Sequence, residues 1–577
     1  MRLRPPTRRA SAITAGFLVF SLLAASCGGT SSDDAGDNDE NGGALESAGL
    51  TAADGESGLD EAGDPVRGGT LTYGQEADTN GGFCLPEAQL AISGMMVSRA
   101  IYDTLTVPNA EGEFVPYLAE SVEPNDDFTE WDITVREGIT FHDGSDLDAE
   151  VVKNNLDAYR GEYEGRASLL FAFVFTSITE TEVVDDLTVR VSTEVPWVAF
   201  PAYLYSSSRL GIMAQSQLDD AETCGTNPVG TGPFSFVNWS PNEIFQAERN
   251  EDYWQMAPDG EPYPYADAIE FVPITDGQVR NQALAGGDID LMHTVNAADI
   301  GTRWRDARDA GEVNLLASEA FGEVAFGQLN QTEPPFDDLR MRQAAAMAID
   351  REQLIQVIGG GVPTLANGPF APDSVAYLED TGFPEYDPDG AQALVEEYVA
   401  DGGDASFTLS STTDPSIRRT AELVQQNMQA VGVEMDINQL DQAALINAAI
   451  GKSYQAMLFR NYPGGDPDQM YLWYYSTDET GEAPNLVNFA GVDSPEVDRL
   501  LDEGRSESDP DAREQIYQDL NREFGEQVHG IWLAYTVWAI VERANVHGIL
   551  GPELPDGSQP NPGLATGHSL LGLWIDQ

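Results

Sequence analysis

The sequence predicts a mixed α/β fold that is divided into two or three lobes. The chain has 577 residues, more than one ordinary hydrophobic core supports, and hydrophobic residues make up 41% of it, enough for a sizeable interior. Segments with the two-residue alternation of strands occur beside segments with the three- and four-residue spacing of helices. Together these observations favour helices packed on sheets in more than one folding unit.

Two segments show the alternation that is typical of half-buried strands. In Glu130–Val135, the apolar residues Trp131, Ile133 and Val135 alternate with polar ones, and Thr188–Thr193 has the same pattern. Both segments are bounded by turn-forming residues, so we expect each to be a single strand.

An amphipathic helix is predicted between two further strands. Its apolar stripe is spaced 4-3-4-3 and consists of Ile417, Ala421, Val424, Met428 and Val431. Apolar residues alternate on both sides of this helix, which makes residues 405–440 a strand–helix–strand unit.

Other helices are indicated by the residues at their ends. Asp350 and Gln353 have the spacing of a capping box, and Gly359 is expected to end that helix. Ser494 and Asp509 each precede a proline, a combination that favours the start of a helix.

The charge of the chain is strongly negative. The formal net charge is −68, from 97 acidic and 29 basic residues. A surface this acidic repels nucleic acid and anionic lipid headgroups, so we expect neither as a partner. The acidity indicates either adaptation to a salty medium, in which screening relieves self-repulsion, or a composition bias of the lineage.

The N-terminal segment has the pattern of an export signal. The basic segment Met1–Arg9 is followed by the apolar run Ala10–Ala25, which is short for a membrane span. The residues Leu23–Cys27 resemble the bacterial lipobox, which implies a signal peptide over residues 1–26 and lipid attachment at Cys27, with two acyl chains sufficient for anchoring. An ordinary signal peptide with an incidental cysteine is the alternative.

The segment 27–65 is rich in Gly, Ser, Ala and acidic residues and has no aromatic residue. Such a composition does not bury enough apolar surface to offset the entropy of ordering, so we expect a flexible stalk.

The two remaining cysteines, Cys84 and Cys224, form an even pair in an exported chain and therefore predict a disulfide. Two free buried thiols are the alternative.

No sequence motif points to catalysis. The sequence has five histidines and no HExxH, CxxC, GxSxG or GxxxxGK[ST] pattern. His142-Asp143-Gly144 is more typical of a turn than of a metal ligand or a catalytic pair. We therefore expect no enzymatic activity, no cofactor and no metal, although paired carboxylates of a secreted hydrolase stay open as an alternative.

Four blocks of the sequence resemble one known family. They are Val115–Asp157, Asn227–Trp254, Tyr263–Leu291 and Leu329–Gly361. Their order and spacing resemble family 5 of the bacterial ABC-transporter solute-binding proteins, the peptide- and nickel-binding group, over roughly residues 66–577. The resemblance implies two α/β lobes that are joined by two crossing segments, with an extra subdomain on the first lobe.

The resemblance also implies the boundaries of these parts. Lobe one is expected to comprise residues 66–107, 225–320 and 547–577, with the extra subdomain over 108–224 and lobe two over 321–546. The crossings are expected near Phe321–Pro335 and Ile531–Val546.

The implied function is that of a receptor outside the cytoplasmic membrane. A monomer would bind a peptide or a similar organic solute between its lobes, close by hinge motion, and deliver the solute to an ABC permease that is driven by its ATPase. An oligosaccharide or organic-acid receptor and a sensor or interaction protein on the same fold are the alternatives, because a fold alone does not determine function.

The segment Tyr454–Tyr475 resembles the family's ligand-binding loop. Peptide-binding members have an aspartate there that pairs with the ligand's ammonium group, whereas this chain has Asn461, which carries no charge. The neighbouring Arg460 favours a carboxylate, a phosphate or a sugar acid, and Asp466 is a candidate to replace the lost carboxylate. A peptide and another organic solute are therefore equally expected as ligands. The candidate ligand-binding residues are Arg460, Asn461, Tyr462, Asp466, Trp473, Phe370 and Asn330.

Several of these residues also have a purely structural interpretation. Asp466 and Asp468 have the position of caps for a helix over residues 470–475. Arg460 is equally expected to pair with a carboxylate at the interface between lobes, and for Trp473 packing in a core is favoured over contact with a ligand.

Overall fold

The structure is a computed structural model, and it describes residues 50, 63–79, 81–462, 464–476, 484–565 and 568–576. The predicted signal peptide, Cys27 and most of the predicted stalk lie outside the described residues. No helix within the described ranges combines the length and the apolar character that crossing a membrane requires.

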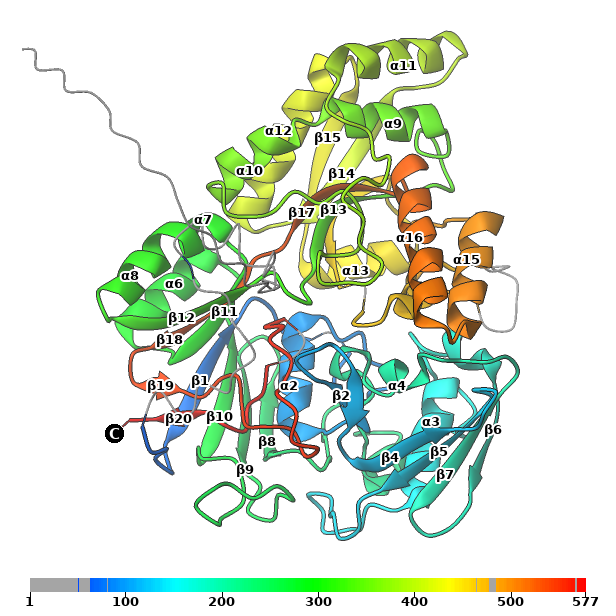
Figure 1. The fold of residues 1–577 in the computed structure, drawn as a ribbon. Helices are drawn as coiled ribbons and strands as arrows, with labels where there is room; N and C mark the ends of the chain where they lie inside the picture. Colours follow the sequence, from blue (N-terminus) through cyan, green and yellow to red (C-terminus); the bar gives the residue numbers. More distant parts are fainter. Residues whose placement is uncertain are drawn as a thin grey trace, which may run out of the picture. The chain divides into compact units, whose positions relative to one another are not determined.

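Lobe one is built on a seven-stranded mixed sheet (Figure 1). In spatial order its strands are β12 (Val313–Ser318), β18 (Trp538–Arg543), β11 (Leu291–Thr294), β1 (Thr70–Gln75), β10 (Ala268–Pro273), β9 (Ile244–Arg249) and β8 (Phe234–Ser240). β1 pairs in parallel with β10 and β11, and its Leu71 and Tyr73 are buried. The helical elements of this lobe are α2 (Ile92–Ile101), α6 (Gly277–Gly286), α7 (Ala297–Asp299), the π-helical turn Ile300–Trp304 and α8 (Arg305–Asp309), and β19 (Val546–His547) pairs with β20 (Trp574–Ile575).

The extra subdomain is an antiparallel four-stranded sheet with a helix against it. The strand order is β4 (Ala119–Pro124), β5 (Glu130–Val135), β7 (Thr188–Thr193) and β6 (Ile178–Val183), and the helix is α3 (Ala149–Arg160). β5 and β7 have the bounds that their alternation predicts, and Trp131, Ile133 and Val135 are buried. The connecting elements are β2 (Thr106–Pro108), β3 (Phe114–Pro116), two 3-10 turns (Val174–Ser177 and Ser206–Ser208), α4 (Phe200–Tyr203) and α5 (Gln215–Asp219).

Lobe two has a five-stranded sheet. Its strands, in spatial order, are β15 (Glu434–Leu440), β14 (Ser406–Thr412), β16 (Ala456–Asn461), β13 (Val324–Leu329) and β17 (Gly530–Tyr535). Its helical elements are α9 (Leu339–Ala348), α10 (Arg351–Gly359), α11 (Pro388–Ala400), α12 (Pro415–Ala430), α13 (Gln442–Ile450), the 3-10 turn Pro467–Gln469, α14 (Met470–Tyr474), α15 (Pro495–Ser506) and α16 (Pro510–Glu526).

The predicted strand–helix–strand unit and the predicted caps are confirmed. β14 and β15 pair in parallel, and Figure 1 shows α12 along them. Asp350 accepts a hydrogen bond from the backbone N–H of Gln353, and Asp509 caps α16 in the same way. α10, which Asp350 caps, ends one residue later than predicted, because Gly360 rather than Gly359 has the left-handed conformation (φ 65°).

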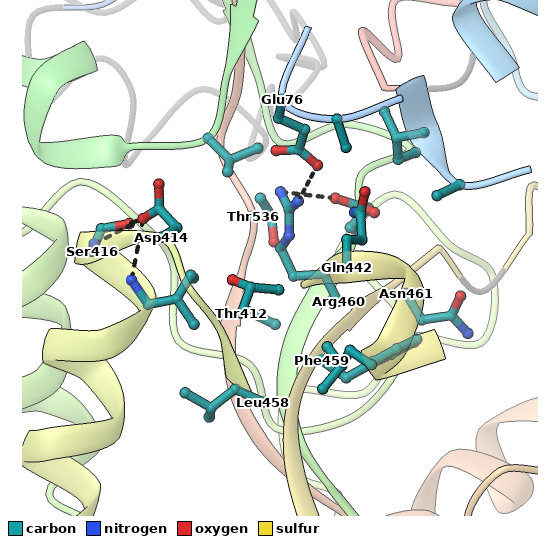
Figure 2. A pocket seen from close by; sticks show the side chains of 18 of the residues that line it. Glu76, Thr412, Asp414, Ser416, Gln442, Leu458, Phe459, Arg460, Asn461 and Thr536 are labelled. Atoms are coloured by element: carbon teal, nitrogen blue, oxygen red, sulfur yellow. Dashed lines mark hydrogen bonds and ion pairs between the residues drawn. The ribbon is translucent and has the colours of Figure 1, made fainter. Parts of the chain in front are cut away.

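The chain passes between the two large sheets twice, once from β12 to β13 and once from β17 to β18. The two crossings lie side by side, because the backbone N–H of Thr536 donates to the carbonyl of Glu323 at 2.8 Å. Thr536 lines the space between the lobes, and Figure 2 labels it there. The two-lobe fold with two crossings is therefore confirmed.

One predicted boundary differs from the structure. The prediction extends lobe two to residue 546, but β18 lies in the lobe-one sheet between β11 and β12. Residues 530–541 are all buried, and a continuous apolar run of this kind is typical of a single strand. The chain nevertheless changes sheets within this run, near Thr536.

One described residue of the predicted stalk is packed. Leu50 is only 3% exposed and belongs to a small apolar cluster with Ile300, Val362 and Val537. The chain therefore contacts the folded part at this residue.

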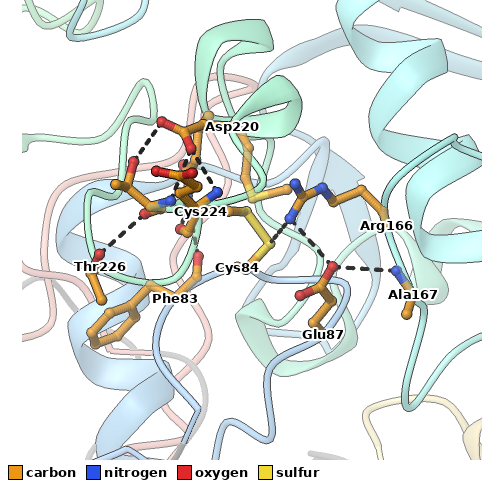
Figure 3. Close-up of a disulfide and its surroundings, with 12 residues drawn as sticks. Phe83, Cys84, Glu87, Arg166, Ala167, Asp220, Cys224 and Thr226 are labelled. Carbon is orange, nitrogen blue, oxygen red and sulfur yellow. Dashed lines mark hydrogen bonds and ion pairs between the residues drawn. A yellow bond between two sulfur atoms is a disulfide. The ribbon is translucent and has the colours of Figure 1, made fainter.

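A disulfide joins Cys84 to Cys224, as the sequence analysis expects. The Cα atoms are 5.0 Å apart, and both cysteines are buried (Figure 3). Arg166 donates hydrogen bonds to the Cys84 sulfur and to Glu87. The bond encloses the extra subdomain in a loop, since 140 positions separate the two cysteines.

Replacing both cysteines by serine should lower the free energy of unfolding by about 2–5 kcal/mol, because the unfolded chain regains the entropy of a long loop. Denaturant titration of both proteins, with and without reductant, measures the difference. Reductant should lower the stability of the wild type to that of the variant and leave the variant unchanged. Equal stability of the two proteins without reductant would contradict the prediction.

A carboxyl group lies buried in the lobe-one sheet. Glu542 on β18 is 2% exposed, and its Oε1 atom has no hydrogen-bond partner. Burial raises the pKa of Glu542 from 4.5 to about 8, although a hydrogen bond from Asn314 lowers it in part. The folded protein therefore keeps this proton over a range in which the unfolded chain releases it.

Glu542→Gln should be more stable than the wild type at pH 8, and this advantage should shrink towards pH 5. The wild type loses up to about 1.4 kcal/mol per pH unit as the pH rises from the unfolded pKa of 4.5 to the folded pKa of about 8. Denaturant unfolding at both pH values measures the difference, with the exposed Glu553→Gln as the control. A pH-independent difference would show that Glu542 ionises normally.

Candidate ligand-binding site

A cavity of about 500 Å³ lies between the two large sheets. Lobe one contributes Glu76 and Arg280 to its wall, lobe two contributes Asp414 and Arg460, and the crossing before β13 contributes Glu323. A ligand in this cavity would contact both lobes and the crossings at once, which is the geometry that hinge closure requires.

An ion-pair cluster forms one wall of the cavity. Arg460 at the end of β16 lies 2.7 Å from a carboxylate oxygen of Glu76 and 3.3 Å from one of Glu323 (Figure 2). Trp538 donates its indole N–H to Glu323 at 3.0 Å. Because Glu76 belongs to lobe one and Arg460 to lobe two, this ion pair joins the lobes across the cavity.

Burial and charge act in opposite directions on these groups. Burial would raise the pKa of Glu76, but Arg460, followed by His293 and Arg280, lowers it to about 2. Burial raises the pKa of Glu323, against the lowering effect of Arg460. Burial lowers the pKa of His293 to about 3, so this histidine is neutral at physiological pH. The cluster therefore consists of one cation and its two carboxylates, with no titrating histidine.

Four of the predicted residues line the cavity: Arg460, Asn461, Tyr462 and Trp473. Arg460 is engaged by the two carboxylates, as its structural interpretation expects, while Asn461 follows it at the end of β16 (Figure 2). Trp473 also packs edge-on against Phe489, with 5.8 Å between ring centroids. That these residues bind a ligand stays a prediction.

The other three predicted residues do not line the cavity. Asp466 caps the 3-10 turn after it and forms a two-bond ion pair with Arg513, at 2.6 and 2.9 Å, so it does not take the place of the carboxylate that Asn461 lacks. Asn330 is fully buried and donates to backbone carbonyls of Lys452 and Tyr454. Phe370 is 1% exposed in the core of lobe two.

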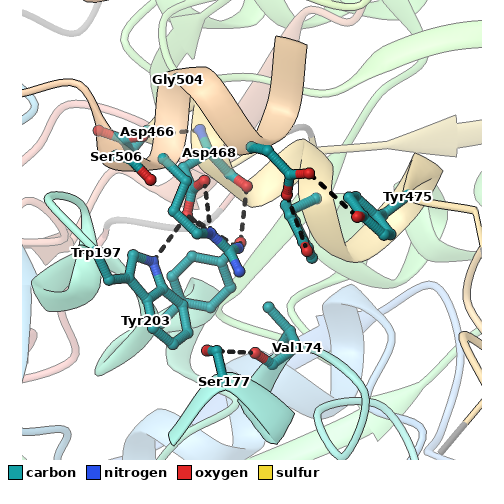
Figure 4. Close-up of polar contacts among 12 residues, drawn as sticks. Val174, Ser177, Trp197, Tyr203, Asp466, Asp468, Tyr475, Gly504 and Ser506 are labelled. Atoms are coloured by element: carbon teal, nitrogen blue, oxygen red, sulfur yellow. Dashed lines mark hydrogen bonds and ion pairs between the residues drawn. The ribbon is translucent and has the colours of Figure 1, made fainter. Parts of the chain in front are cut away.

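A buried contact joins lobe two to the extra subdomain (Figure 4). Asp468 and Arg505, both of lobe two, form an ion pair at 3.1 Å with side chains that are 0% and 2% exposed. Trp197 of the extra subdomain donates its indole N–H to Asp468 at 2.9 Å, and Tyr203 donates its hydroxyl to the Asp468 carbonyl at 2.7 Å. The Arg505 guanidinium also lies 4.4 Å from the centroid of the Trp197 ring. We name Asp468, Arg505, Trp197 and Tyr203 the subdomain contact.

Sequence reasoning missed Glu76, Arg280 and Asp414. Asp414 has a visible signal, because it precedes a proline at the start of α12 and therefore reads as a cap. Glu76 and Arg280 have none, because an acid after a strand and an arginine in the first turn of a helix are common in this chain. Only the folding of distant segments against one another places them in one cavity.

The architecture defines a class of protein before any comparison. Two α/β lobes, two crossings at one side and a cavity lined from both lobes are the features of a binding protein that closes over its ligand. A sequence profile described as bacterial extracellular solute-binding proteins, family 5 (middle region), matches residues 113–482, more than half of the chain. The chain therefore belongs to family 5 of the bacterial extracellular solute-binding proteins, as its sequence blocks predict.

Two relatives agree with this assignment. The glutathione-binding protein GsiB of Pectobacterium atrosepticum is 27% identical over 456 residues, which cover 76% of this chain and 83% of that protein. GsiB of Salmonella typhimurium is 26% identical over 439 residues, which cover 73% and 81%. Proteins of this family are the extracytoplasmic substrate-binding components of ABC importers, and this chain is of that type.

Solved structures show the same fold. The Helicobacter pylori protein DppA, in complex with the peptide STSA, has a TM-score of 0.77 at 21% identity and covers 89% of this chain and 99% of its own. AgaA of A. tumefaciens R10, in complex with agropinic acid, has a TM-score of 0.76 at 24% identity, with 88% and 99% covered.

Asp468→Asn should lower the free energy of unfolding by about 3–5 kcal/mol, because Arg505 would stay buried without its counter-charge. Denaturant titration measures the loss. Asp519→Asn is the matched control, since Asp519 pairs with Arg522 at 2.6 Å on the surface, where such a pair contributes little. Equal effects of the two substitutions would show that the subdomain contact is hydrated rather than buried.

Proposed function

We propose that this protein captures a short peptide or another small amino-acid-derived solute and delivers it to an ABC permease without changing it chemically. The observation that carries the proposal is the cavity of about 500 Å³, which both lobes line with guanidinium and carboxylate groups. Its volume is within the range of small-molecule sites, and its mixture of charges suits a ligand that carries both signs.

The relatives and neighbours support this ligand class. Their names and titles give glutathione, a peptide and agropinic acid as ligands, which are small peptides or an organic acid. Neutral oligosaccharides are less favoured, because the cavity wall carries several buried charges that only a charged ligand offsets.

Closure would follow from the ligand's differential affinity for the closed state. The Arg460–Glu76 ion pair forms only when the lobes are together, so the closed state already has favourable contacts of its own. Opening would expose both groups to water, and their hydration would compensate in part for the loss of the ion pair. The ligand therefore has to supply only the remaining free energy of closure.

The proposal includes the place of the protein in the cell. A lipid on Cys27 would hold a monomer at the outer face of the cytoplasmic membrane, where the permease lies. This part is supported by the sequence of residues 1–27 and by the family.

Ligands of the proposed class should raise the melting temperature of the domain that begins at Val66. A ligand at a hundredfold excess over its dissociation constant stabilises the folded state by about 2.7 kcal/mol. The panel should contain di- to tetrapeptides, γ-glutamyl peptides, opine-type organic acids and neutral oligosaccharides, and calorimetric titration of each hit gives its affinity. Hits among the oligosaccharides alone, or no hit at all, would contradict the proposal.

Arg460→Gln tests, in the same assay, whether the ion pair that joins the lobes contributes to ligand affinity through closure rather than through direct contact with the ligand. The substitution removes the only cation within ion-pair distance of both Glu76 and Glu323 among the described residues, so every ligand should lose affinity by a similar factor. Arg522→Gln, far from the cavity on the surface of α16, is the control.

A further inference from the structure

Arg280 is a buried cation of the cavity wall without an ion-pair partner among the described residues. It lies in the first turn of α6 in lobe one and is 5% exposed. Its Nη1 donates to the backbone carbonyl of Ile274, while its buried Nε has no partner. A buried guanidinium is costly unless it is paired. Of the lobe-one acids whose charges act on Arg280, Glu76 is engaged by Arg460, and Asp276 accepts backbone N–H groups as the cap of α6.

Asp414 is an acid of the opposite lobe with one free oxygen. Its Oδ1 accepts the backbone N–H groups of Ser416 and Ile417, at 2.8 and 3.4 Å, and also the Ser416 hydroxyl. Its Oδ2 takes part in no hydrogen bond or ion pair within the described part of the chain. Figure 2 shows these contacts meeting at one carboxylate oxygen, with the other oxygen directed away from the helix.

These two groups border the same small space. A Cβ atom added to Gly277 would lie 3.7 Å from Asp414 Oδ2 and 3.9 Å from Arg280 Nη2. The two charged groups nevertheless form no ion pair with each other, so they are more than 4.0 Å apart. Gly277, which has no side chain, keeps the space between them open. The space therefore has a cation on the lobe-one side and a carboxylate oxygen on the lobe-two side.

The two charged groups that border this space are not neutralised by a direct ion pair, unlike the charges around Arg460. Burial lowers the pKa of Arg280, and the nearby carboxylates of Glu76 and Asp414 act against that effect. A ligand carboxylate would supply the missing counter-charge for Arg280 with charge-assisted hydrogen bonds. A ligand ammonium would do the same for Asp414 Oδ2.

We propose that the ligand carries a free α-amino-acid head group, whose carboxylate binds Arg280 and whose ammonium binds Asp414 Oδ2. An α-amino acid holds its two charges on neighbouring atoms, which fits two opposite charges that border one small space. The inference rests on the proposed function and narrows its ligand class. It also gives a reason for closure, because the two halves of the head group bind different lobes and only the closed state offers both.

Three probes that differ only at the head group test the idea by calorimetric titration. The tripeptide γ-Glu-Cys-Gly has a free head group, its α-linked isomer has the ammonium but not the neighbouring carboxylate, and N-acetyl-γ-Glu-Cys-Gly has the carboxylate but not the ammonium. We expect the first to bind at least tenfold more tightly than the other two.

Two variants assign the two charges. Asp414→Asn keeps an oxygen that caps α12 and removes the negative charge, so the fold should be unaffected. Arg280→Gln removes the positive charge. Each should weaken binding of γ-Glu-Cys-Gly about tenfold to a hundredfold, while Asp414→Asn should have little effect on the acetylated probe and Arg280→Gln little effect on the α-linked isomer. Asp387→Asn, at the cap of α11 outside the cavity, is the matched control.

The outcomes separate this inference from the proposed function. If a panel solute without a free head group binds and all three probes fail, the head-group inference is wrong and the receptor function stands. The same holds if the three probes bind the wild type equally, or if Asp414→Asn and Arg280→Gln change the affinity for γ-Glu-Cys-Gly less than threefold. If no compound of the panel binds, both the head-group inference and the proposed receptor function are wrong. Unchanged melting temperatures of the two variants would show that any loss of affinity does not come from unfolding.

Discussion

The ion pair between Arg460 and Glu76 determines which groups of the cavity are left for a ligand. Arg460 also lies 3.3 Å from Glu323, so one guanidinium forms ion pairs with two carboxylates, one from lobe one and one from the crossing. The position that the sequence marks as the ligand-binding arginine is thereby used to join the lobes. We propose that Arg280 and Asp414, which border one space and form no ion pair with each other, recognise the ligand instead. The loss of charge at Asn461 is consistent with this shift of recognition to another part of the cavity.

The lobes are held together on two sides of the cavity by contacts of different kinds. At the crossings, the Thr536–Glu323 backbone hydrogen bond lies within the hinge itself, so it does not depend on separation of the lobes. In the subdomain contact, Asp468 and Arg505 both belong to lobe two, and their ion pair would persist on opening. Trp197 and Tyr203 would instead lose their contacts and meet water. Opening would therefore break two sets of contacts between the lobes, the Arg460–Glu76 ion pair in the cavity and the contacts of Trp197 and Tyr203 with lobe two.

The sequence predicted what depends on local pattern. The strands at Glu130–Val135 and Thr188–Thr193, the caps Asp350 and Asp509 and the unit around α12 follow from alternation, apolar spacing and capping chemistry. The change of sheets at Thr536 lies within the predicted crossing Ile531–Val546, but the predicted end of lobe two at residue 546 is too late, because a buried apolar run has the same pattern in either sheet. Of the two interpretations of Asp466, the structure has the cap, and its ion pair with Arg513 has no sequence signal because the two residues are 47 positions apart. Arg280 and Asp414 come together only through the packing of two lobes, which leaves no trace in local pattern.

The disulfide that encloses the extra subdomain in a loop affects how the protein withstands proteolysis. Proteins outside the cytoplasm meet proteases, and loops are where peptide bonds are most readily cut. Every bond between Cys84 and Cys224 lies inside the closed loop, so a single cut anywhere in that stretch leaves one covalently connected molecule. The extra subdomain, which contributes Trp197 and Tyr203 to lobe two, would remain tethered beside its partner surface after such damage. A nicked receptor would thus keep the pieces that it needs in order to close.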